Sequence, residues 1–228
     1  MRLRLLTIGL ALPALAGVAA AQVAPTPDEV AGYSGLHAAA HAGDAERIAE
    51  FAASGADVDA RDGAGRTPAH VAAFASNDEA LRALAAAGAD LNALEGQAYD
   101  VLTIAAVAND PALVKLALAL GNRADLVTSP YDGTALIAAA HLGHHEVVRV
   151  LAAGGAPLDH VNNLGWTALM EAVVLGDGGP AHVATVQVLL SAGADPAIGD
   201  RNGVTPLAHA EARGYSQIAA LLEAAQLE

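Results

Sequence analysis

The sequence predicts an all-α fold in which about six similar helix–turn–helix units stack into a solenoid. Two repeated observations lead to this prediction. A residue that caps helices well recurs roughly every 33 residues and opens a short alanine-rich run. A second apolar run then ends at a glycine, which tolerates the left-handed backbone found at helix ends. A helix pair this short cannot bury its own apolar face, so each unit needs neighbours of the same kind. The capping residues are Ser34, Thr67, Asp100, Thr134, Thr167 and Thr205.

The fourth unit shows the pattern most clearly. Thr134 can cap a first helix whose apolar face includes Leu136. Gly143 interrupts the apolar pattern, and a second helix with Leu151 on its apolar face follows. Gly154 and Gly155 then end this second helix. The six units predicted in this way cover about 32–62, 63–95, 96–129, 130–162, 163–199 and 200–228.

Three units depart from the common pattern. The third has Asp100 at the capping position and Thr103 where the first two units carry a histidine, so we expect it to be the weakest unit of the stack. In the fourth, Gly133 directly precedes the capping residue, which predicts a different loop. The fifth carries about five extra residues around Gly176 and Pro180, which predict an enlarged turn between its helices.

The period and its landmarks resemble the ankyrin repeat. Thr67-Pro68-Ala69-His70 is similar to the start of the family's motif, and Gly193-Ala194-Asp195 is similar to its end. The resemblance covers residues 32–228 and implies hairpin fingers between the units with little or no strand. It also implies a concave surface, made by the fingers and first helices, on which a protein partner docks. Ankyrin proteins share no common ligand, so the partner's identity stays open.

The N-terminus is typical of a secretory signal peptide. Arg2 and Arg4 precede an apolar run over 5–18, and Ala19-Ala20-Ala21 offers small residues for cleavage. We therefore expect residues 1–21 to be removed, residues 22–31 to form a linker, and the mature protein to be periplasmic or secreted, with no membrane insertion. Retention of the segment as a membrane anchor is the alternative, although it is short for a full span.

Composition excludes several classes of function. The formal net charge of −14 argues against nucleic acid as a partner, because that affinity comes mainly from lysine and arginine. There is no cysteine, so no disulfide or thiol chemistry is possible. The sequence carries no nucleophile elbow, phosphate loop, dinucleotide-binding glycine motif or zinc-protease motif. It therefore predicts neither an enzyme nor a cofactor.

The histidines support an alternative function, a metal-binding or oxidative-stress-buffering protein. A structural role is the simpler interpretation, because Gly-His is common in ankyrin turns and histidines at one phase can brace the start of a helix. The candidates are His37, His41, His70, His141, His144 and His145.

A second set of residues suggests a protein-docking stripe. Most of these residues lie one before or seven after the capping residue, and one lies in a neighbouring finger. The two phases resemble the finger and first-helix positions of the concave surface in the ankyrin fold. Tyrosine, tryptophan and arginine are enriched in binding hot spots, although packing between fingers would explain them too. The predicted partner-binding residues are Tyr33, Arg66, Phe74, Tyr99, Tyr131, Trp166, His41 and His141.

Overall fold

The structure, a computed structural model, describes residues 22–227. This part of the chain is helical, and its only strand-like pairing is an isolated bridge between Thr128 and Gly133. The predicted all-α fold is therefore confirmed. None of the helices in this range is long and apolar enough to cross a membrane. The predicted signal peptide lies outside the described residues.

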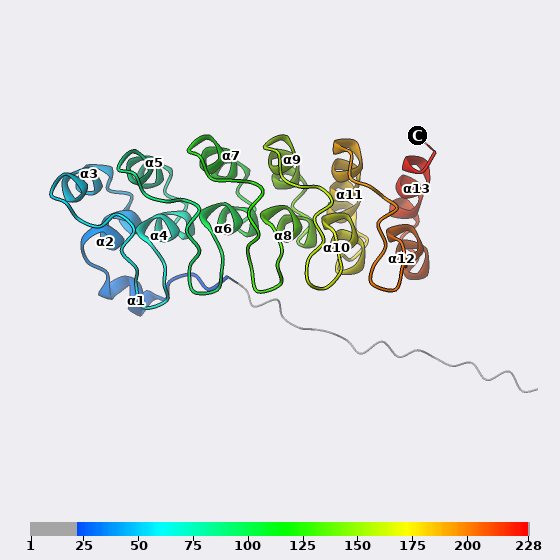
Figure 1. Ribbon diagram of the computed structural model, residues 1–228, viewed down its shortest axis with the longest axis horizontal. Coiled ribbons are helices and arrows are strands. Elements are labelled where there is room, and N and C mark those ends of the chain that lie inside the picture. The colour runs from blue at the N-terminus through cyan, green and yellow to red at the C-terminus, as the bar shows by residue number, and fades with distance from the viewer. Residues whose placement is uncertain (1–21, 228) are drawn as a thin grey trace, which may run out of the picture.

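Twelve of the helices form six successive pairs, stacked in two rows (Figure 1). First helices pack on first helices and second helices on second helices, with neighbouring pairs in contact throughout. The pairs are α2 (Gly35–Ala42) and α3 (Ala45–Ala53), α4 (Pro68–Phe74) and α5 (Asp78–Ala86), α6 (Val101–Val107) and α7 (Pro111–Ala119), α8 (Ala135–His141) and α9 (His145–Ala153), α10 (Ala168–Val174) and α11 (Pro180–Ala192), and α12 (Pro206–Arg213) and α13 (Ser216–Ala225).

Both rows contribute to the core, and the first row adds a recurring pair of small residues to larger ones such as Leu102, Leu136 and Leu169. Buried alanine pairs recur along the first row, as Ala39-Ala40, Ala72-Ala73, Ala105-Ala106 and Ala139-Ala140. Small side chains let successive first helices approach closely, and they interdigitate at the density of a protein interior. The second row contributes leucine, isoleucine and valine, including Ile48, Leu81, Leu113, Leu151, Leu189 and Leu222.

Five of the six predicted capping residues cap their helices with their side chains; Ser34 makes no such hydrogen bond. Thr134 accepts a hydrogen bond from the amide of Ile137 at 3.3 Å, and Asp100 accepts the equivalent bond from Thr103 at 2.8 Å. Asp100 also accepts from the Thr103 hydroxyl at 2.6 Å and from Asn122 at 2.8 Å. The third unit therefore keeps its cap, although burial raises the pKa of the Asp100 carboxyl.

Side chains also bridge successive units by donating to backbone carbonyls. His37 Nε2 donates to the carbonyl of Arg66 at 3.0 Å, and His70 Nε2 donates to that of Tyr99 at 3.1 Å. A second series of such hydrogen bonds lies at the opposite ends of the helices. In it, a side chain at the start of a second helix donates to a carbonyl at or just beyond the end of the first helix of the preceding unit. Its members are Asn77 to His41, His144 to Ala106, His182 to His141 and Tyr215 to Gly176.

Two expectations need correction. Residues 22–31 are no simple linker, because α1 (Pro27–Gly32) forms there with a capping box between Thr26 and Glu29. The extra residues of unit five do not simply enlarge a turn. The turn lengthens only to 175–179, and most of the insertion extends α11 to 13 residues, compared with nine in α9. Pro180 at the first turn of α11 explains the difference, because proline favours helix starts.

His70 gives the stack a pH dependence. Its ring is fully buried, and desolvation lowers its pKa to about 4 from an ordinary value of 6.5. The unfolded chain takes up this proton near pH 6.5 and the folded chain does not, so stability falls as pH falls from 7 towards 4. At pH 5 this group alone should cost about 2 kcal/mol relative to pH 7. Urea unfolding of the parent and His70→Gln proteins at both pH values measures the difference; parallel pH trends in the two proteins would contradict it.

The third unit should open before the fourth. Thr103 bonds the Thr128 hydroxyl at 3.0 Å in place of a histidine-to-carbonyl bridge, and α7 makes only sparse contact with α5. In a solenoid, stability is close to a sum of unit and interface terms, so a weak junction opens locally. Amide hydrogen exchange should therefore be faster in α7 than in α9. Equal or slower exchange in α7 would show that the polar contacts of Asp100 compensate in full.

Candidate functional site: the fingers

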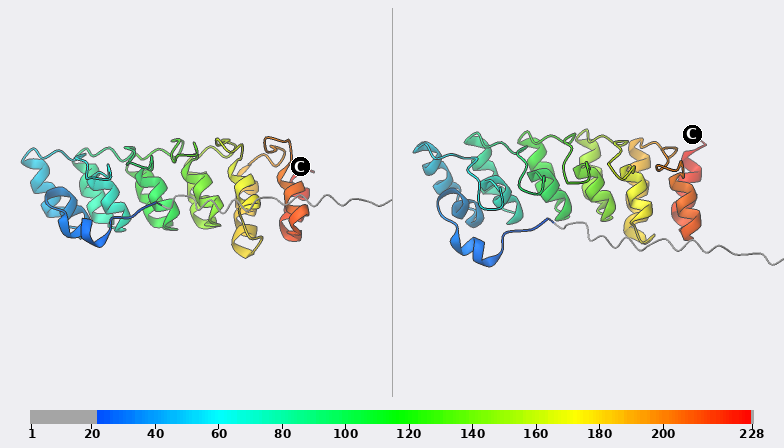
Figure 2. Two further views of the ribbon diagram at one scale, coloured as in Figure 1. Left: turned by 90° about the horizontal axis from the view of Figure 1, so that it is seen from below. Right: turned by 60° about the horizontal axis from the view of Figure 1, so that its bottom comes forward.

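Five loops, or fingers, join successive units and lie along one edge of the stack, at 61–66, 94–99, 127–133, 161–166 and 199–204 (Figure 2). Four of them are closed by one polar side chain each. In the first finger, Asp62 Oδ1 accepts from the amides of Ala64 and Arg66, both at 2.9 Å. In the fourth, Asn162 Oδ1 accepts from those of Leu164 and Trp166, both at 3.0 Å. Glu95 and Asp200 make the same turn in the second and fifth fingers.

The third finger is built differently, as Gly133 led us to expect. The backbone pairing runs from Thr128 to Gly133, one residue longer than from Asp62 to Arg66. The hydroxyl of Ser129 accepts from the amides of Tyr131 and Gly133, both at 3.3 Å. A short hydroxyl thus replaces the carboxylate or amide of the other fingers.

Backbone hydrogen bonds tie neighbouring fingers together. The amide of Gly96 donates to the carbonyl of Ala64 at 3.0 Å, and that of Asn163 donates to the carbonyl of Tyr131 at 2.9 Å. A Cβ at Gly96 would lie 2.4 Å from the Ala64 oxygen, so only glycine allows this approach. The fingers therefore form one connected edge.

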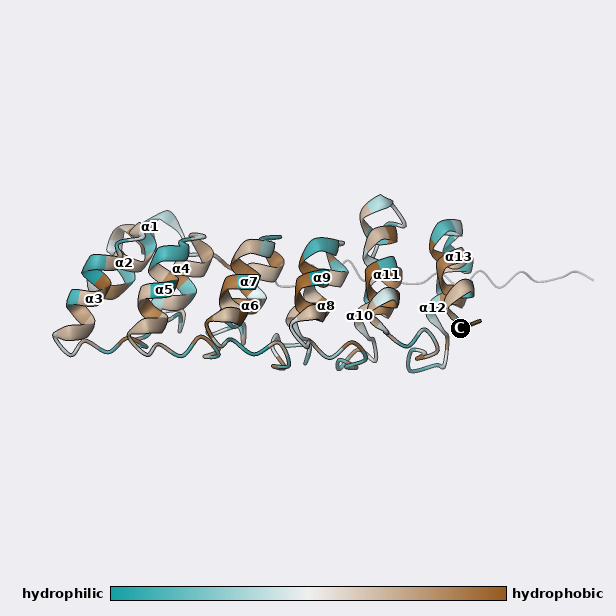
Figure 3. Cartoon of the chain, turned by 90° about the horizontal axis from the view of Figure 1, so that it is seen from above, coloured by the Kyte–Doolittle hydropathy of each residue, from teal (hydrophilic) through white to brown (hydrophobic). Residues whose placement is uncertain are grey.

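The middle fingers expose apolar side chains on this edge, which we call the finger stripe. Two of its members stand directly before the turn-forming residue of the second and fourth fingers, one is the first residue of the third finger, and two lie within the finger turns. In Figure 3 the finger loops along this edge carry hydrophobic segments, coloured brown, between hydrophilic ones, coloured teal. Exposed apolar clusters of this kind mark interaction sites. The stripe comprises Leu94, Val127, Tyr131, Val161 and Leu164, each exposed by 37% to 47%.

Two residues of the predicted docking stripe are buried, so the docking prediction is wrong for them. Arg66 is only 2% exposed, because its guanidinium bonds Asp62 in the finger and Glu29 on α1. Tyr99 is 7% exposed and belongs to the hydrophobic core. Tyr33 is half-buried; its hydroxyl donates to Asp62 at 2.8 Å and its ring lies 5.4 Å from that of His37.

The other predicted residues remain accessible to different degrees. Tyr131 and His41 are exposed, whereas Phe74, Trp166 and His141 are half-buried. His141 Nδ1 donates to the buried carboxylate of Glu171 at 3.1 Å. The accessible predicted residues therefore do not form the single stripe across five units that the sequence suggested.

The histidines do not assemble a metal site. In residues 22–227 no three histidine or acidic side chains lie close enough together to hold an ion. His37, His70 and His144 each donate to a backbone carbonyl of a neighbouring unit instead. The structure therefore offers the metal-binding alternative no site.

Sequence reasoning missed two features of the fingers. The first is the turn-forming residue, which stands five before the capping residue at Asp62, Glu95, Asn162 and Asp200. The second is the apolar residue directly before it in the second and fourth fingers, Leu94 and Val161. Each stands at a repeated position relative to the capping residue, so the sequence contains the signal. The docking prediction rested on aromatic, arginine and histidine residues and therefore omitted these aliphatic ones.

Comparison with known proteins agrees with this architecture. A family profile described as ankyrin repeats in three copies matches residues 13–95 and 102–200. The ankyrin repeat protein YahD of Escherichia coli (strain K12) is 41% identical over 115 residues, which are 50% of this chain and 57% of YahD.

Solved structures extend the similarity over most of the chain. An ankyrin repeat domain from Acinetobacter baumannii AYE is 43% identical, with a TM-score of 0.77, and the match covers 84% of this chain and 97% of that one. The ankyrin repeat protein EF0377 is 31% identical, with a TM-score of 0.76, over 84% and 98% of the two chains. The family profile matches most of the sequence and the solved ankyrin repeat domain matches 84% of the chain, so this chain belongs to the ankyrin repeat family.

Proposed function

We propose that the protein acts outside the cytoplasm as a non-enzymatic module that binds a protein partner along its fingers and concave face. Ankyrin repeats are a scaffold for protein–protein interaction, and stacked repeats create extended binding surfaces. The observation that carries the proposal is the finger stripe, in which five apolar side chains are exposed on hydrogen-bonded, well-ordered loops.

The position of the stripe suits recognition better than folding. Its side chains are at least a third exposed, so removing them leaves the core almost intact. The fingers are held by their own turns and by one another, so little conformational entropy is lost when a partner docks. Exposed aromatic and aliphatic side chains on a rigid edge are typical anchors for a protein partner.

Action outside the cytoplasm is supported by the sequence of residues 1–21, which is typical of a signal peptide. We expect protein purified from its native host to begin at Gln22, with that residue cyclised in part. Mass spectrometry of the intact protein from the extracytoplasmic fraction measures this directly. A chain that keeps Met1 and stays in the cytosol would contradict export.

Truncation of the finger stripe should weaken binding but not folding. Tyr131→Ala and Leu164→Ala should each cost a partner about 2 kcal/mol if they act as hot spots. Their effect on the free energy of unfolding should stay within about 0.5 kcal/mol, because both side chains are exposed. The partner is first captured from a periplasmic extract with a photo-crosslinking residue at position 164, and its affinity is then measured by calorimetry.

Two control variants separate recognition from stability. Lys115→Ala, on the exposed side of α7, should change neither quantity. Tyr99→Ala removes a buried ring, so it should lower stability by about 3 kcal/mol. Crosslinking that is as strong from position 115 as from position 164, or stripe variants that retain full affinity, would exclude the fingers as the docking surface.

A further inference from the structure

Residues 22–33, which we call the strap, lie across the first two fingers. Figures 1 and 2 show α1 and the chain before it running beneath the first helices, from α2 towards α6. The amide of Val23 donates to Gln97 Oε1 in the second finger at 3.3 Å. The carbonyl of Val23 accepts from Arg66 Nη1 in the first finger at 3.4 Å. The strap therefore occupies finger surface that a partner could otherwise reach.

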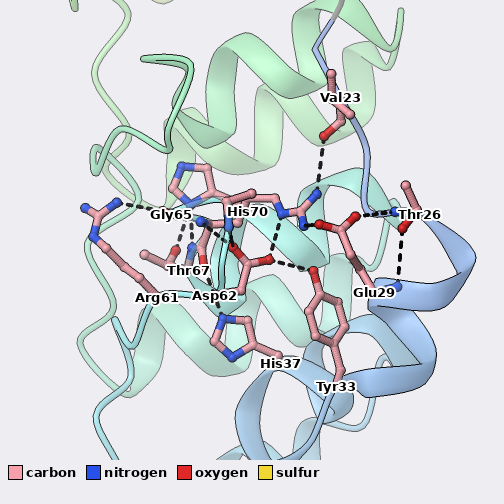
Figure 4. A network of polar contacts seen from close by, with 12 residues as sticks. Val23, Thr26, Glu29, Tyr33, His37, Arg61, Asp62, Gly65, Thr67 and His70 are labelled. Atoms are coloured by element: carbon pink, nitrogen blue, oxygen red, sulfur yellow. Dashed lines mark hydrogen bonds and ion pairs between the residues drawn. The ribbon is translucent and has the colours of Figure 1, made fainter.

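The strongest contact of the strap is made at one buried cation. Arg66 Nη2 donates to Glu29 Oε1 at 2.6 Å, while Arg66 Nε donates to Asp62 Oδ2 at 2.7 Å (Figure 4). The Tyr33 hydroxyl donates to the same Asp62 oxygen at 2.8 Å. Burial opposes the ionised form of Asp62, but these hydrogen bonds and those from the finger amides outweigh it and lower its pKa. Arg66 thus keeps one carboxylate partner inside the finger and takes a second from the strap.

Apart from Glu29 and Tyr33, the strap is held poorly. No residue of α1 is buried, and the side chain of Glu29 remains 41% exposed. The side-chain nitrogen of Gln22 is buried without a hydrogen-bond partner among the described residues, which disfavours the docked state. The main-chain bonds of Val23 are at the long end of the usual range. The strap is therefore an imperfect occupant of this surface.

We propose that the first two fingers form a peptide-binding site, that the strap occupies it in cis, and that an acidic segment of a partner protein displaces the strap. The docked strap shows what the site recognises. Arg66 takes a carboxylate, while Gln97 and Arg66 together take a main-chain amide and carbonyl. A tethered segment acts at a high effective concentration, so the strap excludes weak competitors and yields to a better-fitting segment.

The test uses the strap itself as the probe and needs no partner, so it can fail separately from the proposed function. A fluorescent peptide of residues 22–34 is titrated by anisotropy into the chain beginning at Gln22. The same peptide is titrated into a Glu29→Gln chain, whose own strap lacks the carboxylate. Charge-assisted hydrogen bonds are the stronger kind, so the peptide should bind the Glu29→Gln chain about tenfold more tightly than the parent chain.

Two matched variants define the site. Asp28→Asn makes the same charge change on a neighbouring carboxylate without a contact to Arg66, so it should leave peptide affinity at the parent value. Val23→Cys with Gln97→Cys, joined by a short bis-maleimide, holds the strap closed and should abolish binding. The linkage is unambiguous because the chain has no other cysteine.

Melting temperatures confirm that each variant is folded before its affinity is compared. A probe that carries glutamine in place of Glu29 should bind the Glu29→Gln chain about tenfold more weakly than the native probe does. Equal affinity of the parent, Glu29→Gln and crosslinked chains would place the peptide elsewhere. No binding to the folded Glu29→Gln chain would show that the strap is a permanent part of the fold.

Discussion

No helix pair in this protein can bury its apolar face without the next pair. Both rows supply large aliphatic side chains, the first row adds its alanine pairs, and both are buried only because neighbouring units cover them. Hydrogen bonds across the junctions add direction to this packing. His37 and His70 bridge one end of the helices, while Asn77, His144 and His182 bridge the other, so each unit is aligned as well as covered.

Much of this architecture could be predicted because its determinants are local and repeated. Thr134, Gly143 and Gly154 set where the helices begin and end, through local preferences that act within one unit. Burial at the site could not be predicted in the same way. Arg66 directly precedes the capping residue, a finger position at which a side chain is expected to be exposed. The carboxylate that helps cover it comes from Glu29, 37 residues earlier in the chain. The side chain of Asn77 reaches 36 residues back for the same kind of non-local reason.

The two halves of the finger edge have different chemistry. At the first finger, Arg66, Asp62 and Tyr33 form a polar network that the strap covers, and little apolar surface is exposed. The second to fourth fingers expose the apolar side chains of the finger stripe, such as Val127 and Val161. A partner that met the whole edge would therefore find a charged end and an apolar middle. Such a surface fixes the direction in which a partner lies, because neither part can substitute for the other.

The finger turn has a consequence for how this chain can change over time. One carboxylate or amide, such as that of Asp62 or Asn162, satisfies two backbone amides and closes the loop by itself. The three residues inside the turn contribute mainly their backbone to that closure, so most of their side chains, apart from a glycine such as Gly96 where two fingers meet, are not needed for it. Substitutions can accumulate at these positions without changing how the helices pack. The finger loops can therefore change in sequence, and with them the choice of binding partner, while the stacked helices keep the same structure.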